Sequence, residues 1–370
     1  MSKLLFIQYR RAAKVMNGGD QCTKRNYEML CKVLGAENVD VYYIHNEENH
    51  SPLWSYIVGA WYMLFGYFFG LTPRRVHALV EKAQAYDIVH VDRSVFGILA
   101  KALKDAGYKG KIITHFHNVE KLYFNDKISK HVPFRGLLIG CADKNDAYAC
   151  RYSDALLTLN QRDADCLQEF YGAKVQHVIP ISLPDKAVLP TDKDEKTAPK
   201  LRCLFLGSYF TPNNEGIVWF MQHVASEVDA DIRIVGKGMS KLKAEQPELL
   251  GDIEVVSDAP DLRPYLLWAD AMILPIFSGS GMKVKTCESL MYGKNIIGTD
   301  EAFEGYEIEE GISGWRCNTA EEYIACINDF ARNPHPHWNA AARQLYIDKY
   351  SEKAVMDCFK QVVLRKEIKS

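Results

Sequence analysis

The sequence has no excess of charge of one sign and no pattern of paired cysteines. Its 45 Lys and Arg residues nearly balance its 47 Asp and Glu residues, for a formal net charge of −2. Nucleic acid is therefore not an expected partner, because proteins that bind it carry basic patches. The 10 cysteines include no Cys-x-x-Cys pair, and in a chain of 370 residues we expect reduced thiols and a cytoplasmic location.

Signatures of export and of several enzyme classes are also absent. The start MSKLLFIQYRR has only a short apolar run before charge returns, so we expect no secretory signal. The sequence contains no P-loop lysine motif and no nucleophile elbow. No Gly-x-Gly-x-x-Gly follows the first predicted strand, which argues against a nicotinamide dehydrogenase. The His-containing segment 45–50 fits no standard set of ligands, and we expect no metal site.

The chain has only one long apolar run, residues 53–71, which contains 19 residues without a charge. That length reaches the minimum for a membrane span. Eight of the residues are aromatic, and Trp and Tyr favour the headgroup interface of a bilayer. Arg74 and Arg75 follow, where they would meet anionic lipid. The flanking sequence is typical of one continuous globular domain, which disfavours a span. Two interpretations stay open: a buried helix with part of a lid, or contact with a membrane surface.

Short apolar runs alternate with helical stretches along most of the chain, a pattern that predicts parallel sheets covered by helices on both faces. The predicted helices include 20–34, 96–106 and 214–228. Buried strands are predicted at residues 3–9, 38–44, 86–91, 111–116 and 154–159, and again at 201–207, 231–236, 253–257, 271–276 and 295–299.

The alternation is interrupted by the polar segment PDKAVLPTDKDEKTAPK, which is typical of an inter-domain linker. The fold class is therefore α/β, with two doubly wound, Rossmann-like domains that face a central cleft at the carboxyl ends of their sheets. We place the first domain at 1–183, the linker at 184–200 and the second domain at 201–340. Residues 341–370 are predicted to form a helix that packs back toward the first domain.

The most informative segment is SGSGMKVKTCESLMYG, residues 278–293, which leads from a strand into a helix. Small residues let backbone approach a ligand, and a new helix offers free N–H groups at the positive end of its dipole. Such a terminus binds phosphate. The alternative is a plain glycine turn before an amphipathic helix. The candidate ligand-binding residues are Gly279, Ser280, Gly281, Lys283, Lys285 and Glu288, the last one placed to reach a ribose.

Residues 203–306 closely resemble the nucleotide-sugar domain of glycosyltransferase family 4, the retaining group 1 glycosyl transferases with the GT-B fold. The resemblance rests on CLFLGSYFTPNNEGIVWF, on IRIVGKGM, on DLRPYLLWADAMILPIFSGSGMKVKTCESLMYGKNIIGT and on the Glu304-Gly305 pair. These segments occur in the family's order over about a hundred residues.

The resemblance implies roles for individual residues of the second domain. Glu288 matches the second glutamate of the family's Glu-x7-Glu motif, which binds the donor ribose, whereas the first falls on Ser280 and leaves the donor sugar unassigned. Lys283 and Lys285 are the implied partners of the diphosphate. Gly207 and Ser208 belong to the donor loop. The Arg and Lys that the family often has there are replaced by Ser208 and by Asn213 or Asn214.

In the first domain the resemblance is weaker. Gly18 and Gly19 fall where the family places a glycine loop that approaches donor phosphate or acceptor, although a plain helix-start turn is an alternative. His117, in THFHNVE at 114–120, matches a His-containing loop and is the implied catalytic residue, in contact with the donor sugar or phosphate. His115 is expected to be structural, and Asn160 to cap a helix.

The implied activity is hexosyl transfer with retention, from a nucleotide-diphosphate sugar to a glycan or lipid-linked acceptor in cell-surface polysaccharide or glycoconjugate assembly. The resemblance implies no cofactor and no metal ion, and in this family the leaving phosphate takes the acceptor proton. The implied location is cytoplasmic, with possible peripheral contact at the cytoplasmic face of the plasma membrane through 53–71. The alternatives are an inactive nucleotide-sugar-binding scaffold, which the replacement at Ser280 would allow, a GT-B sugar-nucleotide epimerase, or a phosphorylase.

Overall fold

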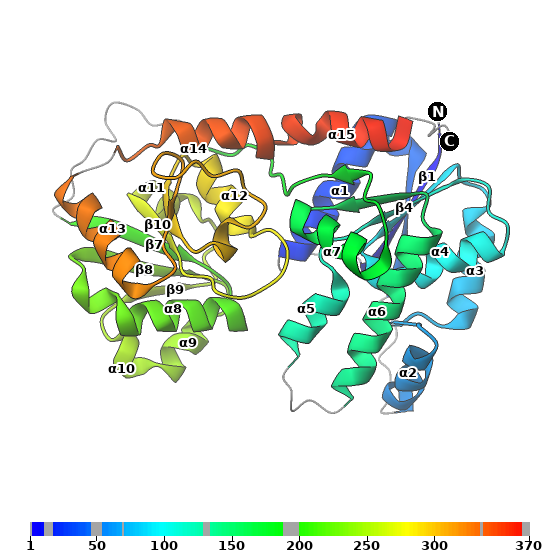
Figure 1. Cartoon of the computed structure of the whole chain (residues 1–370), viewed down its shortest axis with the longest axis horizontal. Helices are drawn as coiled ribbons and strands as arrows, with labels where there is room; N and C mark the ends of the chain where they lie inside the picture. Colours follow the sequence, from blue (N-terminus) through cyan, green and yellow to red (C-terminus); the bar gives the residue numbers. More distant parts are fainter. Residues whose placement is uncertain are drawn as a thin grey trace. The chain divides into compact units, whose positions relative to one another are not determined.

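The computed structural model describes residues 2–10, 18–45, 54–68, 70–128, 134–187, 200–333 and 336–364. The chain forms two compact units (Figure 1). The first comprises Met1–Pro180 with Val355–Ser370, and the second comprises Ile181–Ala354. Each unit contains one six-stranded parallel sheet. The predicted α/β class with two doubly wound sheets is confirmed.

The sheet of the first unit has the order β2-β1-β3-β4-β5-β6. All five strands predicted for this half are present, and the two-residue β6 was not predicted because it is too short to leave a pattern in the sequence. The strands are β1 (Leu4–Arg10), β2 (Val39–His45), β3 (Ile88–Asp92), β4 (Lys111–His115), β5 (Ala155–Thr158) and β6 (His177–Val178).

Helices cover both faces of this sheet. The described helices are α1 (Gly18–Leu34), α2 (Trp54–Leu64), α3 (Pro73–Ala83), α4 (Ile98–Asp105), α5 (Glu120–Lys127), α6 (Arg135–Tyr152), α7 (Gln161–Tyr171) and α15 (Glu352–Leu364). Side chains of one strand alternate between the two faces, so β1 contributes to two separate cores.

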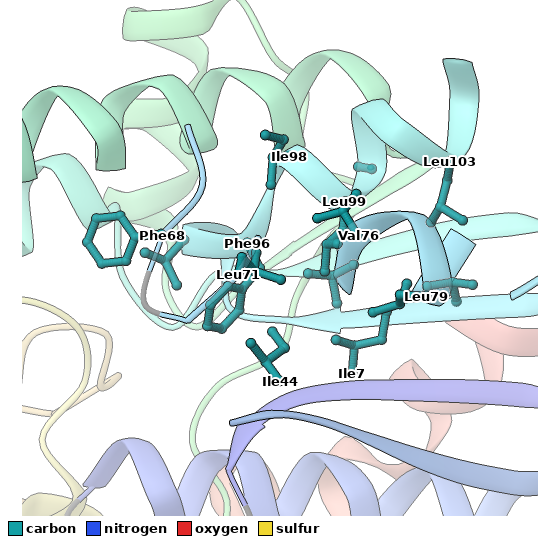
Figure 2. Packing of buried hydrophobic residues seen from close by; sticks show 14 of the residues in the cluster. Ile7, Ile44, Phe68, Leu71, Val76, Leu79, Phe96, Ile98, Leu99 and Leu103 are labelled. Carbon is teal, nitrogen blue, oxygen red and sulfur yellow. The ribbon is translucent and has the colours of Figure 1, made fainter. Parts of the chain in front are cut away.

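The two cores differ in the helices that they join. Leu4 and Phe6 pack with α1 and with Phe359 of α15, and Figure 1 shows α15 (red) alongside α1 (blue). Ile7 belongs to the other core, with Leu79 of α3 and with residues of α4 and α6 (Figure 2). A sheet buried on both faces explains why its strands are almost continuously apolar.

The second unit repeats this plan with the sheet order β12-β11-β10-β7-β8-β9. Its five predicted strands are present, and the two-residue β12 was again not predicted. Figure 1 shows α8 and α12 on opposite sides of the sheet. The strands are β7 (Leu201–Leu206), β8 (Ala230–Gly236), β9 (Glu254–Ser257), β10 (Ala271–Leu274), β11 (Asn295–Gly298) and β12 (Trp315–Arg316). The helices are α8 (Thr211–His223), α9 (Met239–Glu245), α10 (Pro247–Leu250), α11 (Arg263–Trp268), α12 (Val284–Met291), α13 (Ala320–Arg332) and α14 (Ala340–Leu345).

The end of the chain, predicted as one helix over 341–370, is interrupted. After α14 the backbone makes a π-helical turn, Tyr346–Tyr350, and Ser351 is extended. The Ser351 hydroxyl accepts a hydrogen bond from the backbone N–H of Ala354 at 3.2 Å, which is how a serine caps a new helix. The prediction of a single helix was wrong because this capping serine lies inside an otherwise helical pattern.

The long apolar run is also divided. Helix α2 ends at Leu64, and Gly66 follows with φ +88, in the left-handed region where glycine is favoured. Beyond that turn Phe68 is fully buried in the core of Figure 2. Trp61 and Phe65, in contrast, are 61% and 53% exposed. Among the described residues, no helix is both long and apolar enough to cross a membrane.

Helix α8 lies close to the end of β10 because residue 216 has no side chain. A Cβ built on Gly216 would lie 1.8 Å from the carbonyl oxygen of Pro275, far inside van der Waals contact. The close approach brings the start of α8 beside the chain that leaves β10.

Replacing Gly216 by Ala is expected to lower the free energy of unfolding by about 1–3 kcal/mol, as overpacking does. The matched control is Gly140→Ala on α6, where a Cβ would meet nothing within 4 Å. That variant is expected to gain about 0.5–1 kcal/mol, since Ala favours a helix over Gly. Denaturant unfolding of both variants measures the difference, and equal stability of the two would contradict the close approach.

Candidate functional site

In each sheet the strand order reverses once. The first unit places β1 between β2 and β3, and the second places β7 between β8 and β10. Helices that follow the two neighbouring strands leave on opposite faces at such a point, and a crevice opens at the carboxyl ends of the strands. The candidate site residues follow the carboxyl ends of β7 and β10 in the second unit and of β1 and β4 in the first.

The glycine loop after β10 depends on its glycines. Gly279 has φ +119 and Gly281 has φ +67, conformations that residues with a side chain adopt at a cost. Helix α12 starts directly afterwards, with Lys283 as its N-cap residue. The loop therefore leads into a helix N-terminus, as the sequence predicts.

Lys285 lies in the first turn of α12 and contacts one residue of β7 and one of α8. Its ammonium group donates a hydrogen bond to the Asn213 side chain and lies 5.0 Å from the ring centre of Phe205. The Asn213 amide in turn donates to the backbone carbonyl of Ser208 at 2.8 Å. Burial lowers the pKa of Lys285 to about 7, and the positive charge of Lys283 acts in the same direction.

Glu288 lies on the same helix one turn later and stays partly exposed. Burial raises the pKa of its carboxyl to about 7, against the opposing charges of Lys186 and Lys285. Lys186 lies in the segment predicted as a linker, and nothing in its sequence context marks it as a neighbour of this site.

Lys283 has a different environment from Lys285. Its ammonium group forms an ion pair with Glu301 at 2.6 Å and donates to the Gly281 carbonyl at 2.8 Å. Glu301 therefore already compensates the charge of Lys283. The two contacts tie the glycine loop to the turn after β11, and a role of Lys283 in binding diphosphate stays a prediction.

The loop after β7 meets the end of β8. Gly207 donates from its N–H to the Val235 carbonyl at 3.0 Å, and a Cβ on Gly236 would lie 1.9 Å from the Gly207 carbonyl oxygen. The structure thus brings Gly207, Ser208, Asn213 and Lys285 together at the carboxyl edge of this sheet.

In the first unit, Gly18 and Gly19 form the exposed first turn of α1. Both have the backbone of an α-helix, a conformation that does not require glycine. Asn17, the residue before them in the predicted loop, lies outside the described residues.

His117 follows β4 and is 3% exposed. Its Nε2 lies 3.1 Å from the carboxylate of Asp92, the last residue of β3. The same carboxylate accepts a hydrogen bond from Asn26 of α1 at 2.7 Å. Burial by itself would lower the pKa of the His117 imidazole, but Cys22 and Asp92 raise it to about 10.

Sequence reasoning missed Asp92, Asn26 and Cys22. The available signal was the position of Asp92, an acidic residue that ends a buried strand next to the point where the sheet order reverses. His115, expected to be structural, is fully buried at the end of β4. Burial lowers the pKa of His115 well below its ordinary value. Among the described residues, no group of three or more His, Cys, Asp or Glu side chains is arranged to hold a metal ion.

Comparison with known families gives a match at the second unit. Residues 200–333 match the model of the family described as glycosyl transferases group 1. The match falls within the second unit. Among curated proteins, no sequence matches the chain.

Solved structures extend the likeness to the whole fold. Sucrose-phosphate synthase from Thermosynechococcus elongatus is 13% identical over 98% of each chain, with a TM-score of 0.75. HepE of Anabaena in complex with UDP is 12% identical over 98% of this chain and 99% of its own, with a TM-score of 0.70. A glycosyltransferase from Rickettsia africae is 16% identical over 99% of each chain, with a TM-score of 0.67. The chain has the GT-B fold.

The family match and the fold together support a glycosyltransferase of the GT-B type. The glycine loop, Lys285 and Glu288 lie inside the matched residues.

The pKa of Glu288 leads to a prediction for the protein without ligand. Its carboxyl has a pKa of about 7 when folded, above the ordinary value of 4.5, so between these pH values the folded protein holds a proton that the unfolded chain releases. Stability should therefore fall as the pH rises through this window. Glu288→Gln removes that fall.

Denaturant unfolding at pH 5 and pH 7 measures the effect, with the exposed Glu248→Gln of α10 as the control. We expect the free energy of unfolding of Glu288→Gln, taken relative to that of the wild type, to be higher at pH 7 than at pH 5. A difference between variant and wild type that is the same at both pH values would contradict the raised pKa.

Proposed function

We propose that the protein is a retaining hexosyltransferase that uses a nucleotide-diphosphate sugar. The observation that carries the proposal is the glycine loop of the matched domain, which opens helix α12 beside Lys285 and Glu288. The loop and the helix N-terminus hold the diphosphate, and Glu288 holds the ribose. Gly207 and Ser208 border the donor, and Gly18, Gly19 and His117 contribute contacts from the first unit.

The chemistry follows from where charge develops. Departure of the nucleoside diphosphate builds negative charge on its oxygens, and fixed N–H groups and cations aimed at those oxygens stabilise it. Lys285 supplies the cation in this proposal: its pKa of about 7 leaves it only partly charged without ligand, and a bound diphosphate favours its protonated form. The same groups make the proposed transfer independent of a metal ion. The leaving phosphate takes the proton of the acceptor.

The acceptor side of the proposal rests on helix α2. Val58, Trp61, Leu64 and Phe65 of this region are between 42% and 61% exposed. A cavity of about 540 Å³ lies beside them and is lined by Trp61, Phe65 and other apolar residues together with the ion pair of Lys101 and Asp105. Large exposed apolar side chains of this kind mark interaction sites, and Trp favours a membrane interface.

Basic residues accompany the exposed apolar side chains. Arg74 and Arg75 lie in the first turn of α3, and Lys144 of α6 donates a hydrogen bond to the carbonyl of Leu64 at 3.1 Å. Cations beside an apolar face favour anionic lipid. We therefore propose that α2 contacts the cytoplasmic face of the plasma membrane and that the acceptor is a lipid-linked glycan of cell-surface polysaccharide assembly.

A second candidate function is a nucleotide-sugar-binding scaffold without turnover. It is favoured by one observation, the serine at position 280 where the resemblance implies an acidic residue. Binding of a nucleotide sugar without release of nucleoside diphosphate, for every acceptor supplied, distinguishes the scaffold from the enzyme.

Nucleoside diphosphates and their sugars are expected to raise the melting temperature, because a ligand that binds only the folded state stabilises it. UDP is the first to test, since the HepE structure contains it. At 100 times its dissociation constant the ligand contributes about 2.7 kcal/mol. Glu288→Ala and Lys285→Ala should abolish the shift, whereas the exposed Glu248→Ala should keep it. A shift that survives in both site variants would contradict the assigned donor site.

Liposome flotation tests the membrane contact. The wild type is expected to float with vesicles that contain anionic phosphatidylglycerol and to stay at the bottom with neutral phosphatidylcholine. Trp61→Ser combined with Phe65→Ser should abolish flotation. Ile347→Ser is the control, because it removes an apolar side chain that is 41% exposed in the second unit. A wild type that stays at the bottom with both lipids would refute the contact.

A further inference from the structure

The carboxylate of Asp92, at the end of β3, accepts hydrogen bonds from three different side chains. One oxygen accepts from His117 Nε2 at 3.1 Å and from Asn26 Nδ2 at 2.7 Å. The other accepts from the Thr23 hydroxyl at 2.5 Å. Asp92 itself is 1% exposed. A buried carboxylate with donors on both oxygens is held ionised and in one orientation.

The contacts define the state of the His117 ring. An ionised carboxylate can only accept hydrogen bonds, so His117 Nε2 must carry a proton. The other ring nitrogen, Nδ1, is buried and has no partner within hydrogen-bond distance and angle among the described residues, and the Cys22 side chain, which interacts with the ring, leaves it open to a further partner. A buried polar atom without a partner is costly, and a group of the substrate is the natural partner at a sheet edge that binds ligands.

Asp92 also determines whether Nδ1 donates or accepts. In a neutral ring with the proton on Nε2, Nδ1 is an acceptor, whereas in the imidazolium both nitrogens donate. The anion of Asp92 favours the imidazolium. Diphosphate oxygens accept hydrogen bonds only, so a donating Nδ1 suits them and an accepting one does not.

We propose that Asp92 is a positioning residue, which holds His117 as a doubly protonated donor whose Nδ1–H binds an oxygen of the nucleotide-sugar donor. The identity of the bound group rests on the proposed function, whereas the effect of Asp92 on His117 does not. No proton is transferred in this role: His117 keeps both protons while it binds.

Other charged and titratable groups face the ring. From α1 these are Cys22 and Arg25, and from the strands they are His90 and His115. Burial lowers the pKa of His90 to about 4, and that of His115 also lies well below its ordinary value. Both are therefore neutral at pH 7. Among the described residues, Cys22 favours the imidazolium together with Asp92, and its charge has the larger effect of the two.

Asp92→Asn tests the proposal, because the amide keeps the size and polar contacts of the carboxylate but not its charge. In protein labelled with 15N-histidine, the His117 signals, assigned with His117→Gln, are expected to stay doubly protonated in the wild type through pH 8. In Asp92→Asn the pKa of His117 should fall from about 10 toward the ordinary value of 6.5. This measurement needs no substrate, so it decides the effect of Asp92 even if no nucleotide sugar binds.

Two further variants keep the test decisive. Thr23→Val removes a hydrogen bond to Asp92 but keeps the charge of Asp92, so His117 should stay doubly protonated. This variant controls for disturbed packing. Cys22→Ala removes the other group that favours the cation, so the pKa of His117 should fall in this variant as well, while Nε2 stays protonated against Asp92. An unchanged His117 titration in Asp92→Asn would overturn the proposal.

Donor affinity gives a second measurement. At pH 8 Asp92→Asn should bind the nucleotide sugar roughly 10-fold more weakly than the wild type, the loss expected for one charged hydrogen bond. At pH 5.5, where its His117 is protonated again, the affinity should return. A purely structural role would weaken binding equally at both pH values. Binding by the wild type with no such pH dependence in the variant would overturn the contact with the donor while leaving the donor site intact.

Discussion

The reversal of strand order inside each parallel sheet determines where the polar residues of the candidate site lie in each unit. Parallel strands are joined by right-handed crossovers. Where the strand order reverses, the connections that follow the two neighbouring strands therefore leave on opposite faces of the sheet and open a crevice between them. In the second unit that place lies between β7 and β10, and Asn213 and Lys285 meet there. In the first unit Asp92 and His117 meet beside α1.

The candidate site residues of the first unit stabilise buried charges, whereas those of the second unit leave them unfavourable. In the first unit the charge of Asp92 is matched by donors on both oxygens, and the pKa values of Asp92 and His117 move apart: His117 to about 10 and Asp92 well below its ordinary range, because His117 outweighs burial. In the second unit Lys285 and Glu288 both have pKa values near 7, because burial disfavours their charges. A site of that kind gains most from a ligand that brings its own charge.

Much of the fold could be predicted from the sequence, and the reasons are physical. A strand buried on both faces is an uninterrupted apolar run, so Leu4–Arg10 and Ala271–Leu274 were recognisable. The two-residue strands β6 and β12 have too few residues for any period. Ser351 ends one helix and caps the next within a single polar turn, which a helical pattern hides.

The candidate site was predictable only in part. Glycines and the residues of one local segment can be found by spacing, as Gly279, Lys285 and Glu288 were. Partners that come from distant segments cannot: Glu301 lies 18 residues from Lys283, and Asp92 lies 25 from His117. Only the sheet order brings such residues together. No pattern in the sequence distinguishes Lys283, which is ion-paired with Glu301, from Lys285, which forms no ion pair among the described residues.

Hydrogen–deuterium exchange with and without saturating UDP tests most directly that the donor binds where the strand order reverses in the second unit. The account predicts slowed exchange in the peptides that cover the glycine loop and the first turn of α12, residues 278–288, and in the loop after β7, residues 207–213. Slowed exchange confined to the opposite, amino-terminal edge of that sheet, with the glycine loop unchanged, would contradict it.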